Sequence, residues 1–77
     1  MKEILEKYYD KQLRIHLKHH GYNKANLNSY FKGYSVPRPK LLYVICYCIA
    51  LAHDKEFDDI LFETLQSIEK NDMYRTI

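Results

Sequence analysis

The chain has 77 residues, 47% of them hydrophobic, and a formal net charge of +2. This length makes one domain with a single small core, and the longest apolar run, Leu41–Ala52, is too short to span a bilayer. Because the start of the chain is charged, we expect no secretory leader and a cytoplasmic protein with free thiols. The two cysteines lack a Cys-x-x-Cys spacing, so we expect no zinc-finger framework.

Apolar residues recur at helical spacing along almost the whole chain, and no stretch alternates with a period of two. Ile4, Leu5 and Tyr8 form the apolar stripe of a first short helix. Asp10 suits the start of a second helix because its carboxylate can accept backbone N–H groups two or three residues further on. Since no glycine or proline lies near Asp10, one longer helix over residues 2–20 is the alternative.

The second predicted helix ends at Gly21, since glycine adopts left-handed dihedral angles without a Cβ clash. A third helix is expected over residues 24–32, with Asn23 as its cap and Gly33 at its end. The apolar side of this third helix consists of Leu27, Tyr30 and Phe31.

Pro39 fits the first turn of a fourth helix, where its missing N–H has no helical partner to lose. This helix should be the most buried, with apolar positions at Leu41, Leu42, Ile45, Cys48, Ile49 and Ala52. Asp54 is expected to cap a fifth helix, whose apolar positions are Phe57, Ile60, Leu61, Leu65 and Ile68. The predicted fold class is all-α, a compact bundle of about five short helices. Residues 1–70 are expected to form a single domain and residues 71–77 a tail that frays.

The charges are segregated along the chain. Residues 11–40 contain seven lysines and arginines and not one Asp or Glu. Residues 1–40 hold nine basic and three acidic side chains, a charge of +6, whereas residues 41–77 hold three basic and seven acidic side chains, a charge of −4. The small net charge therefore conceals a dipolar molecule, and a basic face of this kind is typical of proteins with a polyanionic partner.

A helix, a short turn after a glycine and a second helix form the helix-turn-helix scheme. In this scheme, the residue four positions before the glycine lies where the two helices cross. An apolar residue six positions after the glycine packs against it, and a second apolar residue follows three positions later. Leu17, Gly21, Leu27 and Tyr30 occupy these positions. The segment 16–51 resembles the lambda-repressor-like, or Cro-type, helix-turn-helix family. The resemblance is carried by LNSYFKG (27–33), VPRPKLLYVICYCIAL (36–51) and FDDILFETL (57–65).

This resemblance implies sequence-specific binding of double-stranded DNA by a small transcriptional regulator, a repressor of phage or mobile-element type. The third helix, residues 24–32, would read the major groove. Asn28 would pair with adenine, Lys24 would donate to guanine, and Ala25 would contact a thymine methyl group. The expected DNA contacts are Asn23, Lys24, Ala25, Asn28 and Ser29, with Lys32, Lys18, Arg38 and Lys40 on phosphates.

One such domain contacts few base pairs, so we expect a homodimer on a palindromic operator, paired through the fifth helix and the tail to Ile77. The alternative is a small interaction protein that binds and inhibits a protein partner, because eight tyrosines can form an adhesive surface. No enzyme activity is expected, since a bundle of this size has little room for a catalytic cleft. No cofactor or metal is expected either, because Cys46 and Cys48 lie two residues apart on a helix and point to different faces.

Overall fold

Five α-helices and no β-strand make up residues 1–72, the part of the chain that the computed structural model describes. In chain order they are α1 (Lys2–Tyr8), α2 (Lys11–His19), α3 (Asn28–Phe31), α4 (Pro39–His53) and α5 (Phe57–Asp72). The predicted all-α bundle of about five helices is therefore confirmed. The last helix includes the first two residues of the predicted tail, and the rest of that tail, residues 73–77, lies outside the described part.

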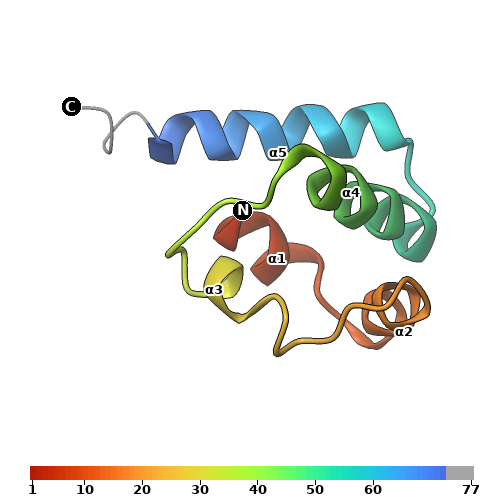
Figure 1. Ribbon diagram of the computed structural model, residues 1–77. Coiled ribbons are helices and arrows are strands. Elements are labelled where there is room, and N and C mark those ends of the chain that lie inside the picture. Colours follow the sequence, from red (N-terminus) through yellow and green to blue (C-terminus); the bar gives the residue numbers. More distant parts are fainter. Residues whose placement is uncertain (73–77) are drawn as a thin grey trace.

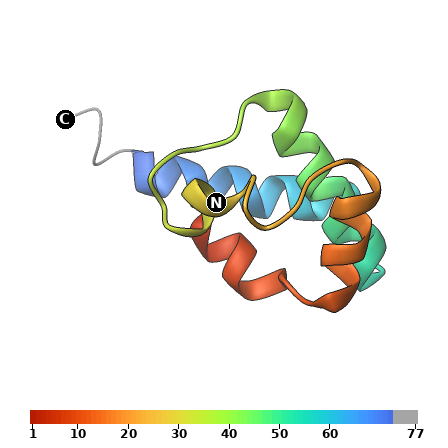
Figure 2. The ribbon, with the colours of Figure 1, turned by 60° about the horizontal axis from the view of Figure 1, so that its bottom comes forward.

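The helix α4 is the central partner of the bundle, because α2 and α5 both pack on it. The first helix packs on both α3 and α5. Figure 1 shows the resulting layers, with α4 and α5 above, α1 in the middle and α2 and α3 below. In the turned view of Figure 2, the connection between α2 and α3 runs as a long irregular loop across the front of the molecule.

The core is built mainly from α4, which contributes six buried side chains, and the predicted apolar stripes of α1 and α2 are buried as well. In α5, Leu65 stays 45% exposed although it fits the apolar register. Thr64 occupies the core position beside it, where its hydroxyl oxygen accepts a hydrogen bond from the Cys46 thiol at 3.5 Å. The largest fully buried side chains outside α4 are Leu5, Leu13, Leu17, Leu27, Ile60 and Thr64.

The first two helices are separate, because Tyr9 between them is extended, with ψ 117°. The carboxylate of Asp10 accepts a hydrogen bond from the backbone N–H of Leu13 at 2.8 Å, so Asp10 caps α2 as predicted. His53, at the end of α4, holds this junction from the core side. Its Nε2 lies 2.8 Å from the carbonyl oxygen of Tyr8 and 3.4 Å from Oδ2 of Asp10. The alternative of one long N-terminal helix is therefore wrong.

Gly21 and Gly33 end α2 and α3 in the same way. Both have positive φ, 88° and 76°, which glycine adopts without a steric penalty. After Gly21, the N–H of Tyr22 donates to the carbonyl oxygen of Leu17 at 2.9 Å, and the equivalent bond closes α3. These are Schellman motifs, which pair carbonyl groups that the end of a helix leaves open. Both glycine stops predicted from the sequence are confirmed.

Asp54 closes α4 and does not open α5, so its predicted role as a cap of the fifth helix is wrong. Its φ of 52° is left-handed, and the N–H of Lys55 donates to the carbonyl oxygen of Ala50 at 2.9 Å. The fifth helix begins only at Phe57. Aspartate tolerates the left-handed region better than most residues because its short polar side chain can bond locally. The same residue type can therefore end a helix as well as begin one.

Replacing Gly21 should measure how much stability depends on having glycine at this left-handed position. Nothing lies within 4 Å of a Cβ built on Gly21, so Gly21→Ala adds no clash and only backbone strain. We expect the free energy of unfolding to fall by about 1 kcal/mol, which lowers the melting temperature by about 4–8 °C in a domain of this size. Gly21→Asn should lose less, because asparagine visits this conformation more readily. Thermal unfolding followed by circular dichroism measures both, and equal losses would contradict the backbone explanation.

Candidate nucleic-acid interface

The third helix is much shorter than predicted. A helix over residues 24–32 is wrong: α3 spans only Asn28–Phe31, and residues 24–27 form turns. The bond from the N–H of Leu27 to the carbonyl oxygen of Lys24, at 3.1 Å, spans three residues and not the four of an α-helix. A helix of four residues is about 6 Å long, so α3 is little more than one turn and is not the extended rod that was expected over residues 24–32.

A pair of asparagines accounts for the missing helical turns. The Oδ1 of Asn23 accepts from the backbone N–H of Asn26, and the Oδ1 of Asn26 accepts from the backbone N–H of Asn23, both at 3.0 Å. Such bonds offer the backbone an alternative to helical hydrogen bonds. Asn23 is therefore part of a closed turn and not the cap of a helix. Leu27 occupies the cap position of α3 and supplies no side-chain bond.

The predicted helix crossing is reproduced only in part. Leu17 and Leu27 are both fully buried, and Tyr30 is partly buried against the same core. The main packing partner of α2 is nevertheless α4, and that of α3 is α1. The two helices of the predicted helix-turn-helix unit, α2 and α3, thus pack mainly on other helices of the bundle and less on each other.

Eight of the nine predicted DNA contacts are exposed. Ser29 is the exception, because it is half-buried and its hydroxyl oxygen accepts a hydrogen bond from the hydroxyl of Ser35 at 2.9 Å. Its hydroxyl is thus engaged inside the turn that follows α3, and the predicted DNA contact of Ser29 stays a prediction. The exposed residues are Lys18, Asn23, Lys24, Ala25, Asn28, Lys32, Arg38 and Lys40.

Three basic side chains meet at one groove of about 440 Å³. The groove is lined by Arg14, Ile15 and Lys18 from α2 and by Asn23 and Lys24 from the turn that follows. No carboxylate lines it, and Ile15 is 50% exposed there. The fold thus brings together Lys18, Asn23 and Lys24 from the predicted set, whereas the other predicted residues do not line this groove.

Two residues of the groove, Arg14 and Ile15, are absent from the predicted set of contacts. Arg14 and Lys18 lie four residues apart, which places them on the same face of α2. This spacing of four residues is the feature of the sequence that could have predicted Arg14 as a contact. Ile15 carries no comparable signal, since a single exposed apolar residue is common on protein surfaces.

Lys24 is held in place by two aromatic rings. Its Nζ lies 5.8 Å from the ring centre of Tyr9 and 5.5 Å from that of Phe31. The two rings contact each other edge to face, with centres 4.9 Å apart. Cation–π attraction of this kind contributes about 0.5–1 kcal/mol at an exposed site. It fixes the turn at residues 23–27 to the α1–α2 junction and keeps the ammonium group of Lys24 near the groove.

The basic side chains of residues 11–40 have no counter-charge in the described part of the chain. All seven are exposed, and they take no part in its ion pairs, which join Lys7 to Glu63 at 2.6 Å and His53 to Asp10 at 3.4 Å. None of these seven cations is therefore neutralised by an ion pair within the described residues. An approaching anion meets a surface whose cations are not neutralised by neighbouring carboxylates.

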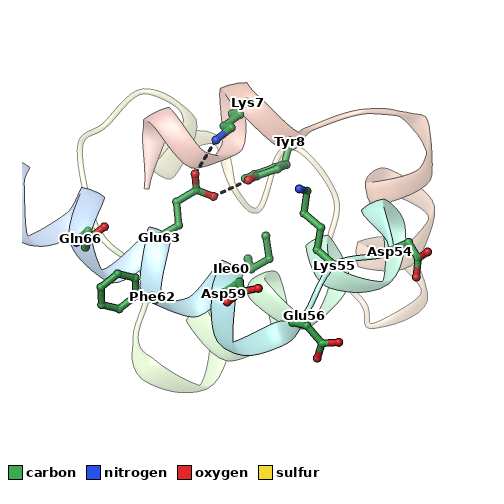
Figure 3. Close-up of a pocket in the computed structure, with 10 residues that line it drawn as sticks. All are labelled: Lys7, Tyr8, Asp54, Lys55, Glu56, Asp59, Ile60, Phe62, Glu63 and Gln66. Carbon is green, nitrogen blue, oxygen red and sulfur yellow. Dashed lines mark hydrogen bonds and ion pairs between the residues drawn. The ribbon is translucent and has the colours of Figure 1, made fainter.

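A second concavity, of about 650 Å³, lies between α1 and α5 on the acidic half. Figure 3 shows Glu63 reaching across it to Lys7 and Tyr8. The Tyr8 hydroxyl donates to Oε1 of Glu63 at 2.5 Å, and Nζ of Lys7 lies 2.6 Å from Oε2. The bond from Lys7, and next that from Tyr8, lower the pKa of the Glu63 carboxyl. Carboxylates outnumber cations in the lining, so this concavity repels a polyanion.

Other kinds of site have less support in residues 1–72. No group of three or more His, Cys, Asp or Glu side chains there is arranged to hold a metal ion. Cys46 and Cys48 are both fully buried, and burial raises the pKa of each thiol, that of Cys48 to about 11. Among the described helices, none has the length and apolar character needed to cross a membrane.

Comparisons with protein-family models, with curated proteins and with solved structures found no match to this chain. The resemblance to the Cro-type family therefore stays a prediction based on the residues quoted for it. Because unrelated functions share the same small helical folds, the fold alone does not decide a function. The functional argument rests on the basic groove and on the charges around it.

The contact of Glu63 with Tyr8 and Lys7 should make stability depend on pH. We expect Glu63→Gln to lower the free energy of unfolding by about 1 kcal/mol near neutral pH, since a partly exposed, charge-assisted contact is weakened. The folded-state pKa of Glu63 lies below its ordinary value of 4.5, so this stabilisation is present above that value and is lost as the pH falls through the folded pKa. Urea denaturation at neutral and at acidic pH measures the difference from wild type.

The matched control for this measurement is Glu69→Gln, because Glu69 is exposed on the same helix and has no hydrogen bond or ion pair within the described residues. Glu69→Gln should leave the stability unchanged at either pH. A deficit of Glu63→Gln that stays constant from neutral to acidic pH would contradict the ionic origin of the contact.

The buried thiols should be unreactive in the folded protein. A thiol with a pKa of about 11 holds very little thiolate at mildly alkaline pH, and Cys46 and Cys48 are both closed to solvent. We expect a colourimetric thiol reagent to label the native protein slowly and to label both cysteines rapidly once denaturant is added. Rapid labelling of the folded protein would show that α4 is more open than described.

Proposed function

We propose that this chain binds double-stranded DNA through α2, the turn at residues 23–27 and the start of α3. The proposal rests on the groove in which Arg14, Lys18 and Lys24 converge with no carboxylate in the lining. Duplex DNA carries one negative charge per about 1.7 Å of its axis, and each cation that contacts a phosphate releases a counterion. Binding to phosphate is most favourable for a cation that forms no ion pair within the protein, because no existing ion pair has to break.

In the proposed mode, α2 holds the DNA backbone and α3 reaches the bases. Arg14 and Lys18 share one face of α2, and Lys24 adds a third cation that is already fixed by its aromatic contacts. Phosphate contacts set the register, whereas base edges carry the sequence information. Asn28 is exposed at the first position of α3, so its amide is available to pair with adenine in the major groove. Lys32, exposed just after α3, adds a phosphate contact.

The narrower proposal is a small transcriptional regulator of the repressor type. It is supported by the resemblance of residues 16–51 to the Cro-type family and by the exposed position of the cations. A regulator of this kind acts by occupying a DNA site, which requires neither a catalytic centre nor a cofactor.

A second candidate function is the binding of a protein partner. It is favoured by the exposure of three tyrosines, Tyr34 at 73%, Tyr43 at 51% and Tyr47 at 49%. Tyrosine suits protein interfaces because it combines a large apolar ring with a polar tip. Salt dependence separates the two functions, since phosphate contacts weaken steeply with salt and an apolar contact does not.

A salt titration of binding to random-sequence duplex DNA tests the proposed function. Lys18→Ala should weaken binding at low salt and should make the slope of log K against log salt shallower by about 0.9, the value for one phosphate contact. Fluorescence anisotropy of a labelled duplex measures both quantities.

The control is Lys55→Ala, which removes the same charge from an exposed position in the acidic half of the molecule. This variant should leave the slope unchanged. If wild-type binding does not depend on salt, or if the two variants weaken it equally, the groove is not the DNA contact.

A further inference from the structure

The outer side of α4 presents a stripe of exposed residues that the bundle does not cover. Tyr43, Tyr47 and Leu51 are 51%, 49% and 48% exposed, and they follow one another at intervals of four residues. Lys40 precedes them by three residues, Asp54 follows by three, and both are exposed. At about 100° per residue, the positions from Lys40 to Leu51 fall within about 80° of the helix circumference. Lys40, Tyr43, Tyr47 and Leu51 thus form one straight stripe along α4, and Asp54 is the left-handed residue that closes the helix beyond the end of this stripe.

The stripe has a symmetric order of residues. Tyr47 is at its centre, Tyr43 and Leu51 lie four residues to either side, and Lys40 and Asp54 lie seven residues to either side. The apolar positions are therefore matched about Tyr47, and the two end positions carry opposite charges. An antiparallel copy of the same stripe would set apolar positions against apolar positions and opposite charges against each other at the ends.

We propose that two copies of this chain associate through the α4 stripe about a two-fold axis at Tyr47. Tyr47 then meets Tyr47 of the second copy, and Tyr43 meets Leu51 of the second copy. At each end, Lys40 faces Asp54 of the second copy with opposite charge, and neither residue has an ion pair within the described part of its own chain. A parallel arrangement would set lysine against lysine and aspartate against aspartate, so the charges select the antiparallel one.

The alternative surface for a homodimer, α5, is less suited to self-association. Its exposed apolar residues are Phe62 and Leu65, at 64% and 45%. Asp58, Asp59 and Glu69 are exposed on the same helix, and no lysine or arginine lies among its residues 57–69. A two-fold contact there would bring carboxylates of both copies together, which is unfavourable. The expected dimer surface on the fifth helix is therefore replaced by the α4 stripe in this proposal.

Both tyrosines of the stripe contact neighbouring aromatic rings, which restrict their side-chain conformations before association. Tyr47 contacts His20 edge to face with ring centres 6.3 Å apart, and Tyr43 contacts Phe57 at 6.4 Å. Side chains that are already ordered lose less conformational entropy when they become buried. Three half-exposed residues contribute about 300 Å² per copy, well below the roughly 800 Å² per partner of a stable interface. The dimer is therefore weak and forms at high protein concentration.

Sedimentation equilibrium without DNA tests the association. The wild-type mass should rise from 9.3 kDa towards twice that value as the protein concentration increases. Tyr47→Glu sets two carboxylates against each other at the axis, so it should weaken the association at least about tenfold. Tyr34→Glu is the control, because Tyr34 is also exposed but lies in the loop before α4. A wild-type protein that stays monomeric throughout, or equal weakening by both variants, would overturn the proposal.

Cysteine cross-linking tests the antiparallel register directly. Tyr47→Cys alone should form a disulfide-linked dimer under mild oxidation, since the residue faces its own copy. Tyr43→Cys and Leu51→Cys should each cross-link poorly alone and efficiently when the two proteins are mixed. The native cysteines are buried and serve as an internal background. Cross-linking of either single variant as fast as the mixture would overturn the proposed register. Because no DNA is present, the result does not depend on the proposed function.

Discussion

The burial of α4 is the constraint on which the rest of the molecule depends. Ile45, Cys46 and Ile49 are fully withdrawn from solvent, and α2 and α5 reach the core by packing on this helix. A chain of this size buries only about 60% of its unfolded surface, so few of these contacts are dispensable. Because the apolar side of α2 is used on α4, its basic side remains in solvent. The exposure of the basic groove thus follows from the packing of α2 on α4.

Much of the fold could be predicted from the sequence, because apolar spacing and helix ends are local signals. The stripe of Ile4, Leu5 and Tyr8, the cap at Asp10 and the stop at Gly21 all lie where their chemistry indicates. Asp54 departs from its predicted role because aspartate favours two different conformations at helix boundaries. Exposure along α5 was harder to predict, since the choice between neighbouring apolar and polar positions depends on the partner helix.

The candidate site could be predicted only in outline. Exposure of the basic window follows from its composition, since unpaired lysine and arginine are almost never buried. The shape of the segment does not, because the reciprocal bonds of Asn23 and Asn26 compete with helix formation and leave no trace in the apolar pattern. The contact of Lys24 with Tyr9, from another part of the chain, is a tertiary event that no local window contains. Site geometry was thus decided by polar and aromatic contacts, and the fold by apolar ones.

The bond between His53 and the carbonyl oxygen of Tyr8 spans 45 residues, and that between Lys7 and Glu63 spans 56. During synthesis, the first forty residues leave the ribosome before the helix that buries them exists. Leu5, Leu17 and Leu27 then have no core to enter, although their local helices can already form. Such a nascent chain exposes apolar surface until the C-terminal half arrives. The basic half of this chain is therefore made before the acidic half, and its buried side chains wait for the acidic half to complete their core.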